Sequence, residues 1–299
     1  MKVLITGGAG FVGSNIVHAL KDEHDVTVLD NLSSGHEENL VGFDGGILDI
    51  DVSQPFTLEE DFDAIIHEAS ITDTTFTDDK EMVRQNVSGF RNVLKLALDK
   101  KAKLVYISSA GVYGNGDVPM KESQSVEPLN AYSRSKAEMD ALAKEQGDAL
   151  IVVGLRYFNV FGMREAGKGA SSSMIYQWRK QILAGEDPGI FKEGEQKRDH
   201  IYVKDVVSAT VKALDASASG IYNVGTGIAT PFVDVLRMVQ SVLGSSKPER
   251  WIANPYTSVY QVHTHASVDL ASSELGYTAQ WKLKEAIADY FAWLDAHEA

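Results

Sequence analysis

The 299-residue sequence contains no cysteine, which excludes disulfide bonds, thiolate nucleophiles and Cys-ligated metals. Basic residues are also scarce, with 28 Lys and Arg against 42 Asp and Glu, which gives a net charge of −14. An acidic surface repels a phosphate backbone and argues against nucleic-acid binding. No apolar run is long enough to span a bilayer. We therefore expect a water-soluble, cytoplasmic globular protein, large enough for an enzyme.

Short apolar runs alternate with amphipathic segments, which predicts alternating strands and helices. Strands are predicted at Lys2–Ile5, Asp25–Leu29, Ala64–His67, Lys103–Ser108, Leu150–Leu155, Ile201–Asp205 and Ile221–Val224. Helices are predicted at Phe11–Lys21, Glu81–Leu98, Ala131–Gln146, a segment ending at Ala184, Phe232–Leu243 and Leu283–Leu294. Continuously apolar strands are typical of a parallel sheet covered by helices on both faces.

A glycine-rich segment separates the first predicted strand from the first predicted helix. It carries the pattern Gly7-x-x-Gly10-x-x-Gly13, followed through Phe11 and Val12 by the helix. Glycines at this spacing permit a tight turn and close approach of the backbone to a pyrophosphate, and the helix N-terminus favours the anion. The segment therefore predicts a dinucleotide site, the alternative being a glycine turn without a ligand.

An acidic residue ends the second predicted strand. Asp30 lies 17 residues after Gly13, close to the offset of ~20 residues at which a carboxylate binds the adenosine ribose. Asp30 would repel a 2′-phosphate, and no Lys or Arg lies between Asp30 and Val52 to receive one. The pair of motifs therefore favours NAD, although Asp30 could also serve as a cap or turn residue.

These signals predict an α/β fold, a Rossmann-type doubly wound parallel sheet with a smaller, discontinuous C-terminal substrate-binding region. We expect residues 1–157 to form mainly the NAD-binding part and residues 158–299 mainly the substrate-binding part, with some segments returning to the first. The active site is expected where the two parts meet.

A second group of residues has the chemistry of an acid/base catalyst. Ser109 follows a strand, and Tyr132 and Lys136 lie four residues apart on a predicted helix. An i,i+4 pair shares one helix face, so the Lys136 ammonium can lower the pKa of the Tyr132 phenol and anchor a ribose, while Ser109 binds the reacting oxygen. Taken alone, such a Tyr–Lys pair is usually a solvated helix pair; the accompanying motifs favour catalysis.

The sequence resembles the extended short-chain dehydrogenase/reductase family, and within it the nucleotide-sugar epimerases, over nearly its whole length. The resemblance is carried by the segments 6–14, 30–32, 108–114, 132–136, 156–162 and 223–227. It implies an NAD-dependent isomerase that acts on a nucleotide sugar through a transient keto-sugar, without a metal, and that forms at least a homodimer. As cofactor contacts the resemblance implies Asn31, Asp49, Ile50, Ala69 and Asn86, in addition to the residues above. As substrate contacts it implies Ser70, Thr72, Ser109, Asn159, Lys168, Arg198 and Tyr260.

A narrower resemblance links the sequence to the ADP-glycero-manno-heptose 6-epimerases. It rests on the segments 67–70, 164–171, 197–203, 260–261 and 290–294. In that family a lysine at the position of Lys168 is a second acid/base across the sugar from the tyrosine, so the resemblance implies a catalytic Lys168. A mobile, solvated loop lysine is the alternative. The segment 33–39 reads more like a 4-epimerase, so a UDP-glucose/UDP-galactose (or N-acetyl) 4-epimerase stays open, and so does a non-catalytic NAD-binding regulator.

Two further features receive no functional role. His263 and His265 form a close pair without an obvious third ligand, so metal binding is not expected. The aromatic side chains of Tyr290, Phe291 and Trp293 are expected to pack the last helix against the core.

Overall fold

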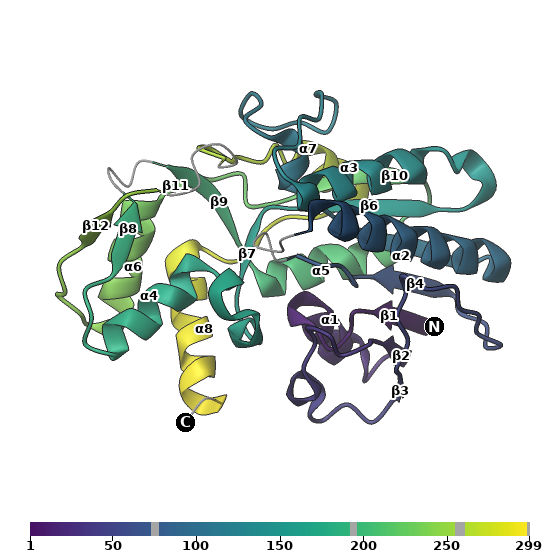
Figure 1. Cartoon of the computed structure of the whole chain (residues 1–299), viewed down its shortest axis with the longest axis horizontal. Helices are drawn as coiled ribbons and strands as arrows, with labels where there is room; N and C mark the ends of the chain where they lie inside the picture. Colours follow the sequence, from purple (N-terminus) through teal and green to yellow (C-terminus); the bar gives the residue numbers. More distant parts are fainter. Residues whose placement is uncertain (73–77, 192–195, 255–260, 298–299) are drawn as a thin grey trace.

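The computed structural model describes residues 1–72, 78–191, 196–254 and 261–297. A seven-stranded, all-parallel sheet forms one side of the molecule, and a smaller region forms the other (Figure 1). The large sheet has the order β10-β6-β5-β4-β1-β2-β3. Its strands are β1 (Lys2–Thr6), β2 (Asp25–Leu29), β3 (Gly46–Leu48), β4 (Ala64–His67), β5 (Lys103–Ser109), β6 (Val152–Tyr157) and β10 (Gly220–Val224). The chain leaves β1 toward β2 on one side and continues at β4 on the other, so β1 and β4 flank the switch point at which such sheets bind ligands.

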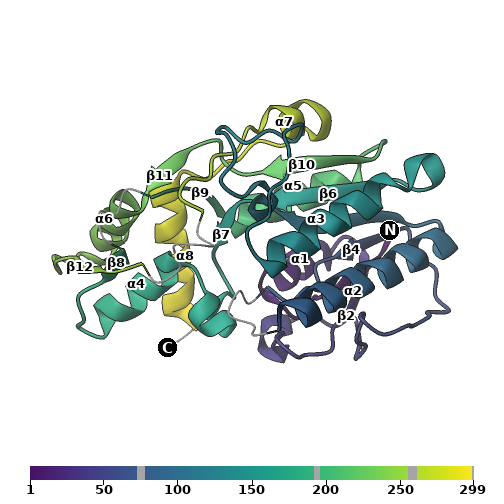
Figure 2. The same cartoon turned by 45° about the horizontal axis from the view of Figure 1, so that its top comes forward.

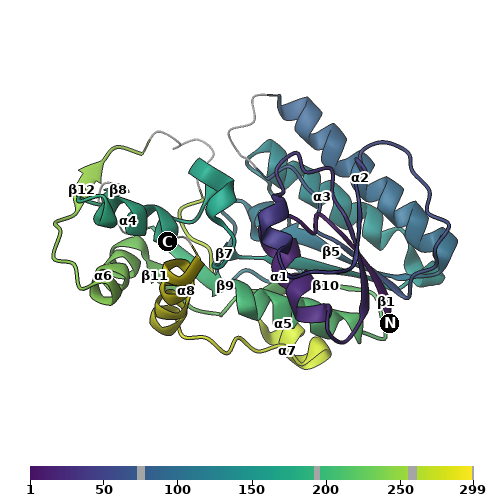
Figure 3. The same ribbon diagram turned by 90° about the horizontal axis from the view of Figure 1, so that it is seen from below.

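Helices cover both faces of the large sheet. On one face α2 (Asp79–Lys100) and α3 (Ala131–Lys144) pack against each other (Figure 2). On the other face α1 (Phe11–Leu20) packs against α5 (Val203–Leu214), with α7 (Asp269–Leu275) beside them (Figure 3). Strands such as β1 and β4 are buried on both sides, which explains their continuous apolar sequences. The predicted doubly wound α/β fold is confirmed.

The smaller region combines two short sheets with three helices around a core of its own. One sheet has the order β11-β9-β7, and the other pairs β12 with β8. Its elements are β7 (Asn159–Phe161), α4 (Met174–Leu183), β8 (Gly189–Phe191), β9 (Lys197–Tyr202), β11 (Ala229–Pro231), α6 (Phe232–Leu243), β12 (Arg250–Ile252) and α8 (Leu283–His297). Tyr290 and Phe291 are buried in this core, and Trp293 packs against it half-buried.

Short 3-10 turns occupy several of the connections, namely η1 (Glu37–Leu40), η2 (Ala110–Tyr113), η3 (Gly147–Ala149) and η4 (Ala166–Ser171). The helix predicted to end at Ala184 is α4, which ends at Leu183. None of the described helices combines the length and apolarity that crossing a membrane requires.

One predicted element is wrong. The strand expected at Ile201–Asp205 ends at Tyr202, and helix α5 begins at Val203. The β-branched residues there favour a strand locally, but the buried positions 203, 206, 209, 210 and 213 recur with the helical period. Burial of that helix face against the sheet outweighs the local strand preference.

Candidate active site

The glycine-rich turn joins β1 to α1 at the switch point of the large sheet. Gly7 has φ +69°, and a Cβ there would lie 2.5 Å from the backbone nitrogen of Ala69, which follows β4. A Cβ on Gly13 would lie 2.1 Å from the Gly7 carbonyl oxygen. Both positions therefore require glycine, because the turn packs directly against backbone on either side.

The N-terminus of α1 opens onto this turn. Gly10 is its N-cap and, among the described residues, no side chain caps it. The backbone N–H groups of Phe11, Val12 and Gly13 belong to the first turn of the helix, where an α-helix leaves its donors without intrahelical partners. The arrangement is suited to bind an anion such as a pyrophosphate.

Asp30 directly follows β2 and is 7% exposed. Its Oδ2 accepts a hydrogen bond from the Ala9 nitrogen at 2.9 Å, and its Oδ1 accepts one from the Leu32 nitrogen at 2.9 Å. The carboxylate thus fixes the glycine-rich turn and still borders a cavity. Asp30 is therefore a turn residue that also lines a cavity, and its role as a ribose ligand stays a prediction.

The cavity beside Asp30 runs from the glycine-rich turn to Gln85, Asn86 and Gly89 of α2. Of the residues expected at the cofactor, those that line it are Gly7, Gly10, Asp30, Asn31, Ile50, Ala69 and Asn86. Ser70 lines the cavity too. Asp49 and Thr72 are solvent-exposed and do not line it. Asn86 is buried, and it pairs with both backbone groups of Ile71 and with the Ser135 hydroxyl, so it fixes the cavity wall to α3.

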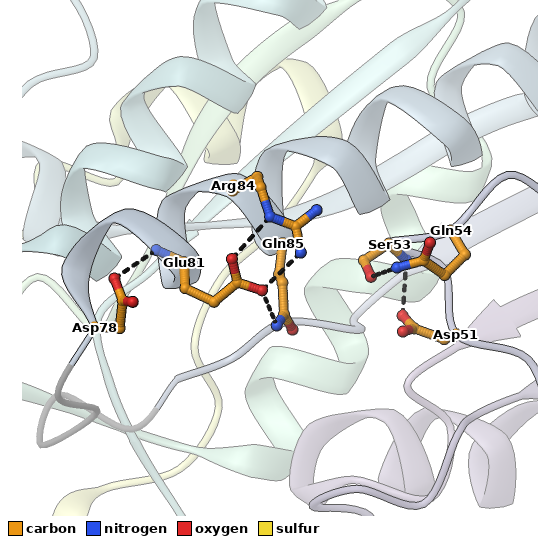
Figure 4. Close-up of polar contacts among 7 residues, drawn as sticks. All are labelled: Asp51, Ser53, Gln54, Asp78, Glu81, Arg84 and Gln85. Carbon is orange, nitrogen blue, oxygen red and sulfur yellow. Dashed lines mark hydrogen bonds and ion pairs between the residues drawn. The ribbon is translucent and has the colours of Figure 1, made fainter.

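Local hydrogen bonds order the 51–54 loop and the first turns of α2 (Figure 4). Asp51 accepts a hydrogen bond from the Ser53 nitrogen at 2.9 Å, and both residues line the cavity. On α2, Glu81 accepts hydrogen bonds from Arg84 and from Gln85, a lining residue. The 51–54 loop is joined to α2 by Asn92, whose side-chain amide donates to the carbonyls of Val52 and Gln54.

Ser109, Tyr132 and Lys136 gather at the carboxyl edge of the large sheet. Ser109 ends β5, while Tyr132 and Lys136 occupy the first turns of α3. Burial raises the pKa of Tyr132 to about 12, against a lowering by its hydrogen bond with Ser109. The Lys136 ammonium lies 5.5 Å from the centroid of the Tyr132 ring. The three predicted residues are therefore brought together.

Lys136 is completely buried, and its Nζ has no hydrogen-bond partner within the described ranges. Burial lowers the pKa of Lys136 to about 8, while the charges of Glu68 and Asp140 raise it. A buried ammonium without a partner is costly unless a ligand supplies acceptors. Together with the glycine cradle and the free N-terminus of α1, this orphaned donor fits a dinucleotide whose ribose hydroxyls reach Lys136.

Lys168 lies in η4, between β7 and α4, in the segment beside α1 in Figures 1 and 3. Its Nζ is 5.5 Å from the centroid of the Phe11 ring, at the N-terminus of α1. Burial lowers the pKa of Lys168, and the charge of Glu165 raises it. The lysine side chain is half-buried against the Phe11 ring, and its role as a second acid/base stays a prediction.

Contacts on both sides hold the Lys168 loop in place. The Asn15 amide of α1 donates to the Met163 carbonyl at 2.9 Å, and its Oδ1 accepts from Arg164 at 3.1 Å. Within the loop, the buried Glu165 carboxylate accepts hydrogen bonds from the Gly162 nitrogen and from the backbone nitrogen and the hydroxyl of Ser173. Sequence reasoning missed Asn15, whose partners Met163 and Arg164 are distant in sequence, and Glu165, whose partners are close in sequence but carry no pattern that marks them.

Asn159 and Arg198 lie on neighbouring strands of the small three-stranded sheet. Asn159 is paired with His200 in register, so Arg198, two residues earlier, shares its face. Arg198 is 5% exposed and donates to the carbonyls of Lys197 and Gln261, and Asn159 accepts from Thr264. Tyr260, the remaining predicted substrate contact, lies outside the described residues. In the described ranges no group of three metal-ligating side chains is found; His263 and His265 stack on each other.

Comparisons with known proteins identify the family of the chain. The family described as NAD dependent epimerase/dehydratase matches residues 3–225, and the chain belongs to that family. It is 39% identical over 284 residues to the ADP-L-glycero-D-manno-heptose-6-epimerase of Brachyspira hyodysenteriae, with 89% of each protein covered.

Solved structures resemble the whole chain. The ADP-L-glycero-D-manno-heptose-6-epimerase of Helicobacter pylori has a TM-score of 0.93 at 37% identity, covering 99% of this chain and 96% of that one. A UDP-N-acetylglucosamine 4-epimerase of Methanobrevibacter ruminantium has a TM-score of 0.92 at 28% identity, covering 99% and 98%. The predicted family and the resemblance to heptose 6-epimerases are confirmed.

Proposed function

We propose that the chain is an NAD-dependent epimerase that inverts C6 of an ADP-glycero-manno-heptose. The placement of Lys168 carries this proposal, because it adds a second ammonium group beside the cofactor turn, on a different element from Tyr132. The 39% identity to a heptose 6-epimerase over 89% of the chain supports the same substrate.

NAD would be held by the glycine-rich turn and the N-terminus of α1 at its pyrophosphate, by Asp30 at the adenosine ribose and by Lys136 at the other ribose. Asn31, Ile50, Ala69 and Asn86 would complete the cavity walls, with Asp49 near the adenine. When bound, NAD accepts a hydride from the sugar carbon and returns it to the opposite face of the resulting ketone.

Tyr132 would take the proton from the C6 hydroxyl, with Ser109 orienting the same oxygen and Lys136 stabilising the phenolate. Rotation of the exocyclic arm would then turn the carbonyl oxygen away from Tyr132. Lys168 would donate the proton on that new side, and burial, by lowering its pKa, makes its ammonium a better proton donor.

The nucleotide diphosphate would lie against Asn159 and Arg198, with Ser70, Thr72 and Tyr260 nearer the sugar. We further propose that the protein works in the cytoplasm as at least a homodimer, for which the outer faces of α2 and α3 are the candidate interface. We also propose residues 1–157 and 158–299 as its two main parts, with β10 returning to the first sheet. Light scattering of the purified chain would test the oligomeric state.

Replacement of Lys168 by methionine tests the proposed function most specifically. We expect Lys168→Met to lose at least ~10²-fold in epimerisation of ADP-heptose, the scale of a lost acid/base, while a single hydride transfer initiated by Tyr132 survives. Lys180→Met, on the exposed surface of α4, is the matched control and should retain full activity. Near wild-type epimerisation of ADP-heptose by Lys168→Met would remove Lys168 from the mechanism, and efficient inversion at C4 of a UDP-sugar by the wild type would favour a 4-epimerase, in which the whole ring turns and the tyrosine acts alone.

A further inference from the structure

A buried ion pair joins α3 to the large sheet. The Oδ2 atom of Asp140, on α3, lies 2.9 Å from Nε and 2.8 Å from Nη2 of Arg156, on β6. Its other oxygen accepts a hydrogen bond from the Tyr106 hydroxyl of β5 at 2.9 Å. Arg156 is 1% exposed and Asp140 is 4% exposed. Because each hydrogen bond is directional and both charges are buried, the pair restricts α3 to one orientation on the sheet.

The same guanidinium also contacts η2. Its Nη1 donates to the Tyr113 hydroxyl at 2.8 Å, and that hydroxyl donates to Oδ1 of Asn223, on β10, at 2.7 Å. Nδ2 of Asn223 in turn donates to the carbonyl of Met120 at 2.8 Å. Tyr113 and Asn223 are completely buried. Arg156 therefore connects α3 to η2 and β10 through one continuous set of hydrogen bonds.

Both ends of this set are close in the chain to the acid/base residues. Tyr132, Lys136 and Asp140 are spaced four residues apart on α3, so they share one face of the helix. Tyr113 belongs to η2, whose N-cap is Ser109. The hydrogen bonds of Arg156 thus fix the rotation of α3 about its axis and the position of the turn that follows Ser109.

The two elements also touch each other directly. A Cβ on Gly111 of η2 would lie 2.4 Å from the Ser133 hydroxyl oxygen of α3 and 3.2 Å from the Ser109 hydroxyl oxygen. There is no room for a side chain between η2 and the first turn of α3. A small shift of either element therefore changes the distance between Ser109 and Tyr132.

We propose that Arg156 is a positioning residue that, through Asp140 and Tyr113, holds α3 and η2 where Tyr132 and Ser109 reach the same substrate oxygen. This inference rests on the proposed function, because it concerns the acid/base group of that same site. Arg156 acts through its partners and is assigned no contact with substrate or cofactor. Since a misplacement of about 1 Å can cost about 10²-fold in rate, its contribution should be measurable in kcat.

The first experiment separates positioning from stability by neutralising the buried pair in two steps. Arg156→Met leaves the Asp140 carboxylate buried without its counter-charge and should lower the melting temperature by roughly 10 °C. Adding Asp140→Asn removes that charge, and the asparagine can still pair with the Tyr106 hydroxyl. The double variant should therefore regain most of the lost melting temperature.

Turnover should not return with stability. At a temperature where every variant is folded, we expect kcat for ADP-heptose to stay about 10- to 100-fold below wild type in the double variant. KM should stay within about three-fold, because the proposed diphosphate contacts, Asn159 and Arg198, lie on other elements. Recovery of kcat together with the melting temperature would show a purely structural role and overturn the inference.

A single oxygen atom allows a finer test with a matched control. Tyr113→Phe removes the hydroxyl between Arg156 and Asn223 and should lower kcat about 5- to 10-fold. Tyr222→Phe also removes a buried hydroxyl, one that donates to Glu274 of α7 on the opposite face of β10, and should keep kcat within about two-fold of wild type. Equal kcat values for the two variants would contradict the proposal.

Amide hydrogen exchange tests the hold on α3 without any substrate. In Arg156→Met/Asp140→Asn the backbone amides of α3 should exchange about ten-fold faster than in the wild type, while those of α1 keep their rates. Unchanged exchange in α3 would refute the role assigned to Arg156. Absence of wild-type turnover on ADP-heptose would refute the proposed substrate, and the exchange rates would still decide whether Arg156 holds α3.

Discussion

Asp30 holds the glycine-rich turn and is proposed to set the choice of cofactor, so one substitution there should have two measurable effects. Asp30→Asn removes a charge and keeps the shape. The carboxylate accepts backbone hydrogen bonds from Ala9 and Leu32 on separate oxygens, both at 2.9 Å. An asparagine has one acceptor oxygen, so one of these N–H donors faces an amide NH₂ in a site that is 7% exposed. The unsatisfied donor should cost about 1–3 kcal/mol of folding free energy.

The effect on cofactor choice follows from the lost charge. Two like unit charges 4 Å apart repel each other by about 4 kcal/mol at an effective dielectric constant of 20. Solvent screening would reduce the repulsion between the Asp30 carboxylate and a 2′-phosphate below that value. We therefore expect Asp30→Asn to reduce the preference for NAD over NADP by about 10- to 100-fold, a change of about 1.4–2.8 kcal/mol. The hydrogen bond to a ribose 2′-hydroxyl would weaken at the same time.

Calorimetric titration of cofactor-stripped protein with NAD and with NADP measures the ratio of the two dissociation constants directly. Thermal unfolding of the wild type and Asp30→Asn measures the loss of folding free energy. Asp30→Glu is the matched control, because it keeps the charge while its longer side chain disturbs the turn. The reasoning would be refuted if the wild type bound NADP more tightly than NAD, or if Asp30→Asn left the ratio unchanged.

Two further substitutions test the tyrosine and the turn. Tyr132→Phe removes the acid/base oxygen and should lower turnover at least ~10²-fold while NAD binding is retained. A single-turnover assay and a cofactor titration measure these two quantities. Near wild-type turnover would remove Tyr132 from the mechanism. Gly13→Ala places a methyl group 2.1 Å from the Gly7 carbonyl oxygen and should lower both the melting temperature and the NAD affinity. Gly46→Ala is the control, because the nearest atom to its methyl group is 3.8 Å away, and it should change neither. Equal melting temperatures for the two variants would contradict the packing described for the turn.

The first half of the fold and several residues of the candidate site are predictable from sequence because each carries a local signal. Gly7, Asp30 and Tyr132 stand at strand ends or helix starts, where hydrophobic periodicity fixes the element and a parallel sheet brings its carboxyl ends together. The predicted strand at Ile201–Asp205 fails at Val203 because burial against the sheet selects a helix there.

Other features have no local signal. Glu68 is one polar residue after an apolar strand, and its hydrogen bond with the Tyr157 hydroxyl of β6 joins residues that only the folded chain brings together. The anchoring of the Lys168 loop depends in the same way on Asn15, which lies 148 residues before Met163. Long-range polar contacts of this kind are set by the packing of sheets and helices, and sequence patterns do not encode them separately.

The central claim is that this chain inverts C6 of an ADP-heptose. The direct measurement is to incubate the purified wild type with one C6 epimer of ADP-glycero-manno-heptose and to follow the stereochemistry of the sugar by NMR, with UDP-glucose and UDP-N-acetylglucosamine as parallel substrates. The account predicts conversion to an equilibrium mixture of the two C6 epimers, with little change in either UDP-sugar. Efficient inversion at C4 of a UDP-sugar, with the ADP-heptose left unchanged, would contradict it.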